Sequence, residues 1–419
     1  MNKEWNGQSL IKLRRELHRS AEVGFSLDGT RSIIQNALCA LDVEYKEIGK
    51  GSIVARLGAG ECGILLRADM DALAMREESA VDFASQNGCM HACGHDMHTA
   101  MLLGALANLS KNRTSLPVEI RFLFQASEEN LMGARDAIEH GVLSPWEEIC
   151  TENSRKCKQL LEKEQNFFIK SALSLHCIVG VALPLGTLIV PREGVSAPAS
   201  AFFTVKLTGE SAHGGAPQMG RDALFAMHSL YSAFCSLTSR TVSIKDEPLL
   251  TVGQMQAGVS ANVIAARAQM SGTVRASDDG AEECLLSRMR HLTAQISAAF
   301  GVSGELSING FAPTLRNDPS LAQRAYRCLC EALPHTRVVF SEELYGTDGQ
   351  KKSGGSEDFA HFSHLIPSLL VAIGAGDLRE GYTAPLHHPA VRFDERALEI
   401  GAEAYAHLAL CLADIVPSP

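Results

Sequence analysis

Short apolar runs alternate with helical patterns through the first two hundred residues of the chain. Residues 52–57, 63–68 and 119–125 have the length and composition of strands. Residues 98–109 have the apolar period of a helix, and a second helical pattern covers residues 133–140. Because strands that alternate with helices pack as a sheet covered on its faces, this pattern predicts an α/β fold.

The pattern changes after about residue 191. Here the predicted elements are strands at 201–207, 262–275 and 305–309 and helices at 222–240 and 281–300. This mixture is typical of a small ferredoxin-like α+β unit. After residue 311 the α/β pattern returns, with a strand at 368–373 and a terminal helix at 394–415.

The length and this order together predict two domains. A chain of 419 residues exceeds the size at which one hydrophobic core keeps growing. We therefore predict a larger domain made of residues 1–190 and 312–419, into which residues 191–311 are inserted. The charged segment 146–170 fits neither domain and looks like an extra insertion. It is either a solvated surface helix or loop, or a functional lid.

Composition excludes several classes of function. The formal charge of −10, without a basic stripe, argues against a nucleic-acid partner. Charge or glycine interrupts every long apolar run, so no membrane span is expected. The polar start of the chain, Met1 to Asn6, does not resemble a secretory signal, and a cytoplasmic location is therefore expected.

The densest chemical signal is the stretch MHACGHDMH at residues 90–98. Cysteine and histidine are preferred ligands of borderline divalent metals, and so many polar groups are costly to bury without a cation. The stretch therefore predicts a metal site. Because one ion cannot use every member, His91, Asp96 and His98 are either ligands themselves or groups that support the ligands.

Further polar residues follow the predicted strands. Glu128 and Glu129 come after the strand at 119–125, where one carboxylate can bind metal and the other can take a proton from water. Asp69 and Asp71, in the RADMD motif, either orient metal ligands or form structural ion pairs. Two further histidines are candidates: His176 ends the run 171–175, and His387 lies in the motif LHHP.

Together these motifs resemble the aminoacylase-type metallopeptidases and amidohydrolases, the group of hippurate hydrolases, indole-acetyl-amino-acid hydrolases and N-acyl-amino-acid deacetylases. The resemblance spans nearly the whole chain. Its markers are LHRSAEVGF, RADMDAL, MHACGHDMHTAMLLGA, FQASEE, GESAHGGAP, ANVI with GTVR, GSEDFA and LHHP. It implies a mixed-sheet metallopeptidase domain with an inserted lid or dimerisation domain.

The resemblance also implies roles for single residues. Its metal ligands match Cys93, His95, Glu129, His176 and His387, which would hold two divalent ions per subunit, zinc, manganese, cobalt or nickel. Glu128 matches the general base. His213 matches a histidine that stabilises the oxyanion, commonly in the active site of the partner subunit. Asn262 and Arg275 match positions that hold polar groups of the substrate, although a surface ion pair is the alternative for Arg275.

These matches predict hydrolysis of N-acyl-L-amino acids to a carboxylate and a free amino acid, by a homodimer joined through the inserted domain. Three alternatives stay open: a dipeptidase or carboxypeptidase acting on small peptides, a homologue that binds metal or ligand without catalysis, and an enzyme that uses Cys93 as a thiol nucleophile. The acyl group, the amino acid and the metal cannot be read from the residues.

Several positions depart from the family pattern. Ser20, Ala74, Ala126 and Ala265 stand where the family usually has proline, which changes loop rigidity but removes no ligand. The extra segment 146–170 also lies between Glu129 and the next predicted ligand. His140 is therefore a second candidate for the position assigned to His176.

Overall fold

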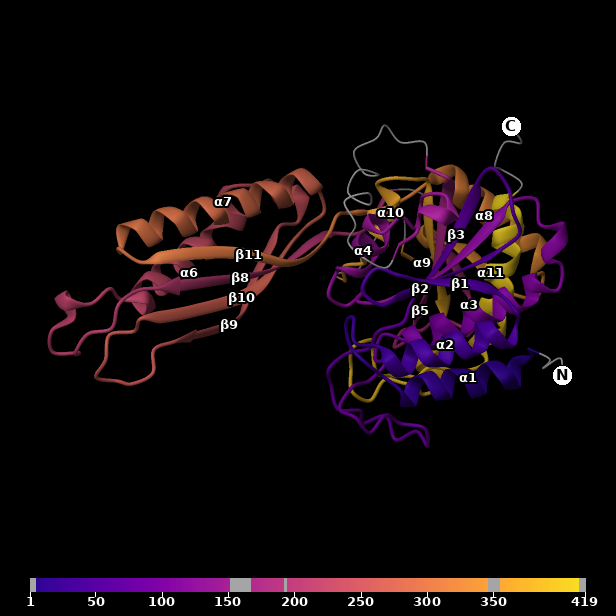
Figure 1. The fold of residues 1–419 in the computed structure, drawn as a ribbon, viewed down its shortest axis with the longest axis horizontal. Helices are drawn as coiled ribbons and strands as arrows, with labels where there is room; N and C mark the ends of the chain where they lie inside the picture. The colour runs from indigo at the N-terminus through magenta and orange to yellow at the C-terminus, as the bar shows by residue number, and fades with distance from the viewer. Residues whose placement is uncertain (1–4, 151–166, 192–193, 346–354, 414–419) are drawn as a thin grey trace. The chain divides into compact units, whose positions relative to one another are not determined.

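The computed structural model describes residues 5–150, 167–191, 194–345 and 355–413 (Figure 1). It divides into two compact units. Unit 1 falls within Met1–Ser196, Arg316–Lys351 and Asp358–Pro419, and unit 2 falls within Ala197–Leu315 and Lys352–Glu357. The chain thus changes unit a few residues after each boundary expected from the sequence, and the described residues 355–357 group with unit 2 instead of the larger unit.

Unit 1 contains an eight-stranded mixed sheet. In spatial order its strands are β1 (Glu44–Ile48), β2 (Ser52–Leu57), β4 (Glu119–Gln125), β3 (Gly63–Asp69), β5 (Ile169–Ile178), β14 (Ser368–Gly374), β6 (Leu188–Val190) and β13 (Val338–Phe340). The central strands β4, β3, β5 and β14 are parallel neighbours, whereas β2 runs antiparallel to both β1 and β4. Every residue of β3 and β4 is buried, because parallel strands covered on both faces need continuous apolar runs. The predicted α/β class is confirmed.

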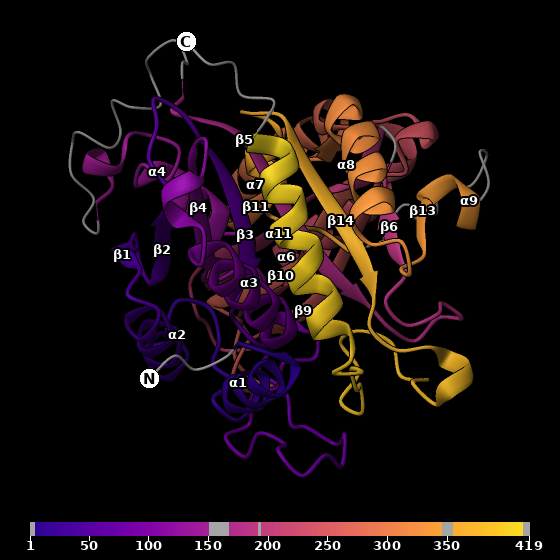
Figure 2. The same ribbon diagram turned by 90° about the vertical axis from the view of Figure 1, so that its right-hand side faces the viewer.

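Helices pack on this sheet (Figure 2). They are α1 (Gly7–Arg19), α2 (Asp28–Ala40), α3 (His95–Ser110), α4 (Gly133–Glu139), α8 (Pro319–Ala332), α9 (Ser341–Tyr345), α10 (Ala360–Ser363) and α11 (Ala397–Ala413). Helix α3 lies against both α1 and α11, and nearly all of its residues are buried. A side chain on Gly104 would meet Ala402 of α11 at 2.8 Å, which shows how closely these helices approach. Among the described residues, no helix is long and apolar enough to cross a membrane.

Unit 2 is a four-stranded antiparallel sheet with two helices on one face. The strands are β11 (Ser303–Ala312), β8 (Ala199–Thr208), β10 (Arg267–Ala276) and β9 (Leu249–Ala257) in spatial order, and the helices are α6 (Ala223–Arg240) and α7 (Asp279–Ala299). Phe203 and Phe234 meet edge to face in the core between the sheet and α6. The chain order βαββαβ and this strand order are those of a ferredoxin-like unit.

The remaining elements are short. A two-stranded sheet is formed by β7 (Gly194–Ala197) and β12 (Leu315–Asn317). Single 3₁₀ turns occur at Arg113–Ser115, Trp146–Glu148, Pro217–Met219, Ile244–Asp246 and Leu378–Glu380.

Two sequence predictions need correction. The helix expected from residue 98 begins at His95, which places this histidine in its first turn. The strand expected from Asn262 begins only at Arg267, and β9 was not predicted. The extra insertion at 146–170 stays a prediction; at the described ends of this segment, Trp146 is 3% exposed and donates to Glu44, and the last residues begin β5. Residues 151–166 of this prediction lie outside the described residues.

Candidate functional site

The candidate site lies at the edge of the large sheet where the parallel strands β3, β4 and β5 end. Asp69 and Gln125, the last residues of β3 and β4, are direct neighbours in the register. Beyond them the chain continues to Asp71 on one side and to Glu128 on the other. Because parallel strands end at the same edge, residues far apart in the sequence meet here.

All five predicted metal ligands converge at this edge. Their ligand atoms fall into overlapping groups whose members lie within 4.8 Å of one another: Cys93 with His95 and His176, Cys93 with Glu129 and His387, and His95 with Glu128 and Glu129. The Cys93 Sγ atom is 3.6 Å from His176 Nε2, and His387 Nε2 is 3.6 Å from Glu129 Oε1. Cys93 therefore belongs to two ligand groups at once.

Backbone carbonyls orient two of the histidines. His95 Nδ1 donates to the carbonyl oxygen of Asp71 at 2.8 Å, and His176 Nδ1 donates to that of Cys177 at 2.8 Å. Each Nε2 atom is thereby turned toward the cluster. His95 Nε2 is buried and has no hydrogen-bond partner within the described part of the chain. A buried nitrogen lone pair of this kind fits a metal ion.

Turns with uncommon backbone angles present the other ligands. Ser127 and Leu131, on either side of the glutamate pair, have φ angles of 57° and 56°. His387 has a φ angle of 64°, and its N–H donates to the carbonyl oxygen of Ala92 beside the metal-binding stretch. Positive φ is unfavourable for residues with a side chain and is often found at functional sites.

The protonation states suit metal binding better than thiol catalysis. Burial lowers the pKa of His176 to about 3, so its imidazole is neutral, the form that binds a metal. Burial also raises the pKa of the Cys93 thiol, and the nearby carboxylates Glu128 and Glu129 raise it further. His95 lowers this pKa in part, but the pKa stays above its ordinary value, and a thiol with a raised pKa is a poor nucleophile.

The other members of the MHACGHDMH stretch support the site from outside the ligand groups just described. His98 lies near Asp69 and His95 but uses both of its nitrogens: Nδ1 donates to Asp69 at 2.6 Å, and Nε2 accepts from the N–H of Cys177 at 2.8 Å. Its lone pair is therefore not available to a metal. Asp96 binds Arg14 at 2.7 Å instead. His91 is buried and belongs to none of the groups.

The two aspartates of the RADMD motif are both structural and orienting. The carboxylate of Asp71 accepts from the backbone N–H groups of Glu128 at 3.0 Å and Glu129 at 3.3 Å, which fixes the glutamate turn. Asp69 accepts from His98 and pairs with the buried Arg67 at 2.9 Å. Neither role excludes the other.

Sequence reasoning missed one residue of this network. Asp358, in the GSEDFA motif, is fully buried and accepts from Arg67, Gln125 and the N–H of Ala134. Its N–H lies 3.4 Å from Glu128 Oε1. An acidic residue within a family motif was the only available signal, since its partners are hundreds of residues away.

The second candidate for the His176 position is not supported. His140 donates through Nδ1 to the carbonyl oxygen of Asp136, four residues earlier in α4, at 2.7 Å. It takes part in none of the ligand groups that the described residues form. His176, near the end of β5, belongs to the ligand group that contains Cys93 and His95.

In unit 2 the structure brings together two of the three predicted residues. The backbones of His213 and Val263 form an isolated β-bridge, and the N–H of Gly214 donates to the carbonyl oxygen of Asn262 at 2.8 Å. Arg275 lies near the other end of β10, where it donates to Ser356 at 3.2 Å. Since strands rise by about 3.3 Å per residue, roughly 26 Å of strand separates the two ends.

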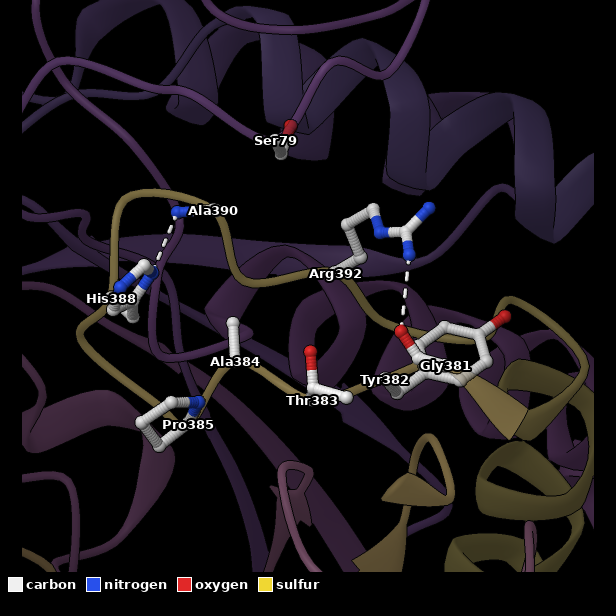
Figure 3. A pocket seen from close by; sticks show the side chains of 9 residues that line it. All are labelled: Ser79, Gly381, Tyr382, Thr383, Ala384, Pro385, His388, Ala390 and Arg392. Atoms are coloured by element: carbon white, nitrogen blue, oxygen red, sulfur yellow. Dashed lines mark hydrogen bonds between the residues drawn. The ribbon is translucent and has the colours of Figure 1, made fainter. Parts of the chain in front are cut away.

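A hollow of about 410 Å³ lies in unit 1, and His388, the residue after His387, is among the residues that line it (Figure 3). It is lined by Ser79, Gly381, Tyr382, Thr383, Ala384, Pro385, His388, Ala390 and Arg392. None of the five predicted metal ligands lines it. His388 Nδ1 accepts from the N–H of Ala390 at 3.1 Å, and Arg392 donates to the carbonyl oxygen of Gly381 at 3.2 Å.

Comparison with known proteins identifies the family to which this chain belongs. The model of peptidase family M20/M25/M40 matches residues 65–410. The chain belongs to peptidase family M20/M25/M40. It is 30% identical over 412 residues to an N-acetylcysteine deacetylase of Bacillus subtilis, with 97% of each chain covered. It is 28% identical over 410 residues to a thermostable carboxypeptidase of Saccharolobus solfataricus, covering 96% of this chain and 94% of the relative.

A solved structure of a member of the family agrees with this assignment. A Bacillus subtilis protein described as a dinuclear metal binding peptidase of the M20 family is 28% identical to this chain, with a TM-score of 0.71. The match covers 99% of this chain and 100% of that one. The sequence prediction of a hydrolase from this M20 group is confirmed, as is the α/β fold.

Proposed function

We propose that this M20 protein is a two-metal amidohydrolase that cleaves the amide bond of N-acyl-L-amino acids. The observation that carries the proposal is the position of Cys93, which is shared by two ligand groups beside a buried pair of glutamates. A thiolate within reach of two groups is well placed to contact two ions. The name of the Bacillus subtilis relative, an N-acetylcysteine deacetylase, supports an N-acyl amino acid as substrate.

The donor set fits two divalent ions. His95 and His176 would contribute to one position and Glu129 and His387 to the other, with Cys93 between them. Two such ions, when bound, would polarise the acyl carbonyl group and lower the pKa of a water molecule toward neutrality. Thiolate and imidazole favour zinc, and manganese, cobalt and nickel are the other candidates.

Glu128 is the residue that moves the proton. Its side chain is buried beside the ligand cluster, with Oε2 3.9 Å from His95 Nε2. Asp71 accepts from its backbone N–H, and the N–H of Asp358 lies 3.4 Å from its Oε1 atom, so both its backbone and its carboxylate are positioned. In the proposed reaction Glu128 takes a proton from the attacking water and delivers it to the nitrogen of the leaving amine.

Arg275 and Asn262 are proposed to bind polar groups of the substrate. Burial lowers the pKa of Arg275 from its ordinary value, but a guanidinium keeps its charge at any physiological pH. Its fork of donors matches the carboxylate of an amino acid. Arg275 donates to the hydroxyl group of Ser356, and no carboxylate among the described residues forms an ion pair with it, which does not favour a surface ion pair.

His213 is proposed to act in the active site of a partner subunit. It lies together with Asn262 at the opposite end of β10 from Arg275, so one rigid copy of unit 2 cannot bring Arg275 and these two residues to the same small substrate. A homodimer through unit 2 resolves this conflict. Leu249 and Met255 on the edge strand β9, with Leu224 and Phe225 on α6, expose apolar side chains that a second copy could cover.

A carboxypeptidase or dipeptidase is the second candidate. The same proton transfer cleaves a peptide bond, and one relative is named a thermostable carboxypeptidase. The two candidates differ in whether the acyl part carries a free amino group. A reading without catalysis is not favoured, because Glu128 and the whole ligand set are present.

The test is amine release from N-acetyl, N-benzoyl and N-indole-acetyl amino acids and from dipeptides. Protein stripped by a chelator is reloaded separately with zinc, manganese, cobalt or nickel. Release from acylated amino acids, abolished by stripping and restored by metal, is the expected result. Release from dipeptides alone would favour the peptidase, and silence on every substrate with two ions bound per chain would contradict both.

A further inference from the structure

Two cysteines face each other where α8 packs against α11, in the helical layer of unit 1. On α8, Cys328 follows the buried Ala325 by three residues, and on α11, Cys411 follows the buried Leu408 by three. This spacing places each cysteine on the flank of its helix's buried face. Both cysteine side chains are half-buried.

The contacts of Cys328 place it directly on α11. Its Sγ atom lies 3.6 Å from the carbonyl oxygen of His407, to which the thiol donates. His407 precedes Cys411 by four residues, so the two lie one above the other on the same helical face. Cys411 also lies close enough to raise the pKa of the Cys328 thiol. A disulfide requires the two sulfur atoms to reach about 2.05 Å, which side-chain rotation of cysteines on two packed helices can provide.

Neither cysteine has a part in the proposed metal site, since neither belongs to any ligand group of the described residues. We propose that Cys328 and Cys411 form a reversible redox site, in which a small-molecule disulfide converts the two thiols into a disulfide that joins α8 to α11. The inference is independent of the proposed substrate.

The exchange proceeds in two steps. The thiolate of Cys411 attacks one sulfur of the small disulfide, forms a mixed disulfide and releases the other half as a thiolate. The thiolate of Cys328 then attacks the Cys411 sulfur and displaces the second half. The protein dithiol loses two electrons, the small disulfide gains them, and its two thiolates take up the two protons. Cys411 attacks first because its contact raises the pKa of Cys328.

The bond would join the two helices that pack beside the central strands. Helix α11 carries Tyr405, whose hydroxyl group contacts the backbones of β3 and β5. A disulfide that closes so long a loop restricts the unfolded chain strongly, so the oxidised protein should unfold at a higher temperature than the reduced protein.

The experiment uses full-length, metal-loaded protein incubated with oxidised glutathione. We expect intact mass to fall by about 2 Da, as two thiols become one disulfide. Peptide mapping should join the segments that contain Cys328 and Cys411, and dithiothreitol should restore both thiols. Stable glutathione adducts on wild-type protein, or a link between other cysteines, would overturn the proposal.

Matched variants test the assignment. Cys328→Ser and Cys411→Ser should each abolish the intramolecular link, and Cys411→Ser should also prevent the glutathione adduct at this pair. Cys330→Ser is the control, because Cys330 is exposed on α8 two residues from Cys328 and points elsewhere. Loss of the link in Cys330→Ser would contradict the pairing. If a serine variant fails to fold, the wild-type peptide map still decides the question.

Discussion

The hydroxyl group of Tyr405 on α11 donates to the carbonyl oxygen of Arg67 on β3 at 2.7 Å. The hydroxyl oxygen of Tyr405 also accepts from the N–H of Leu175 on β5 at 2.8 Å. The pairing of β3 with β5 ends at Arg67 and Ser174, so these backbone groups lie where the two strands separate. Farther along β5, His98 accepts the N–H of Cys177. Hydrogen bonds to the side chains of Tyr405 and His98 thus replace backbone hydrogen bonds between the strands, where β3 and β5 separate near the predicted metal ligands.

Replacing Tyr405 with phenylalanine should therefore destabilise the protein without changing its shape. The N–H of Leu175 would be buried without its hydrogen-bond partner, and the carbonyl oxygen of Arg67 would lose one of its hydrogen bonds. The expected cost is about 1–3 kcal/mol. Unfolding in urea measures this loss. Tyr231→Phe on the exposed face of α6 is the control and should change the free energy of unfolding little. Equal effects of the two variants would contradict the role given to Tyr405.

Glu128→Gln should abolish turnover and keep the metals. The amide cannot take a proton, and loss of a general base typically lowers turnover by about 10²–10⁴-fold. Metal analysis by mass spectrometry should find the same two ions per chain as in the wild type. If the variant keeps its activity, Glu128 is not the base.

Cys93→Ser should lower both metal content and activity, because serine does not supply a thiolate to the two ligand groups that share this position. Cys177→Ser is a matched control, since Cys177 is equally buried but belongs to no ligand group of the described residues. Its expected cost is in stability alone. A Cys93→Ser protein that binds two ions with unchanged affinity would remove Cys93 from the ligand set.

Mixing two inactive variants tests whether His213 acts across a dimer. In a mixed dimer of Glu128→Gln and His213→Ala chains, one of the two sites has both wild-type residues. Random exchange of subunits should then restore about one quarter of wild-type activity, provided that the symmetric dimer reassembles. Absence of any recovery, with mixed dimers demonstrated by native mass spectrometry, would mean that His213 acts within its own chain or not at all.

Stability should fall as pH rises through the pKa of His18. Burial opposes the charge of this imidazole, but the carboxylates of Asp96 and Glu77 outweigh it and raise the pKa. Because the folded pKa exceeds the unfolded one, the contribution is complete below about 6.5 and is lost as pH rises through the raised value. His18→Gln should flatten the pH dependence of the unfolding free energy over this interval. An unchanged slope would contradict this assignment.

Local pattern and motif spacing determined a large part of this protein from the sequence alone. The strands at 52–57 and 119–125 were predicted with their observed bounds, since a run buried on both faces is visible in composition. The composition of residues 90–98 predicted a metal site because cysteine and histidine are costly to bury in such numbers without a cation, and the family resemblance supplied the five ligands by name. Strand β9 could not be predicted, because its side chains are mostly exposed and lack a clear apolar period.

Only the tertiary structure decided which polar residues face the cluster and which support it. His95 and His98 are three residues apart in the same motif, yet one keeps a buried nitrogen without a partner and the other has both nitrogens bonded. The distinction depends on the N–H of Cys177, which the fold brings from another strand. The distance between His213 and Arg275 was decided in the same way, because the direction of β10 is a property of the sheet and not of local sequence.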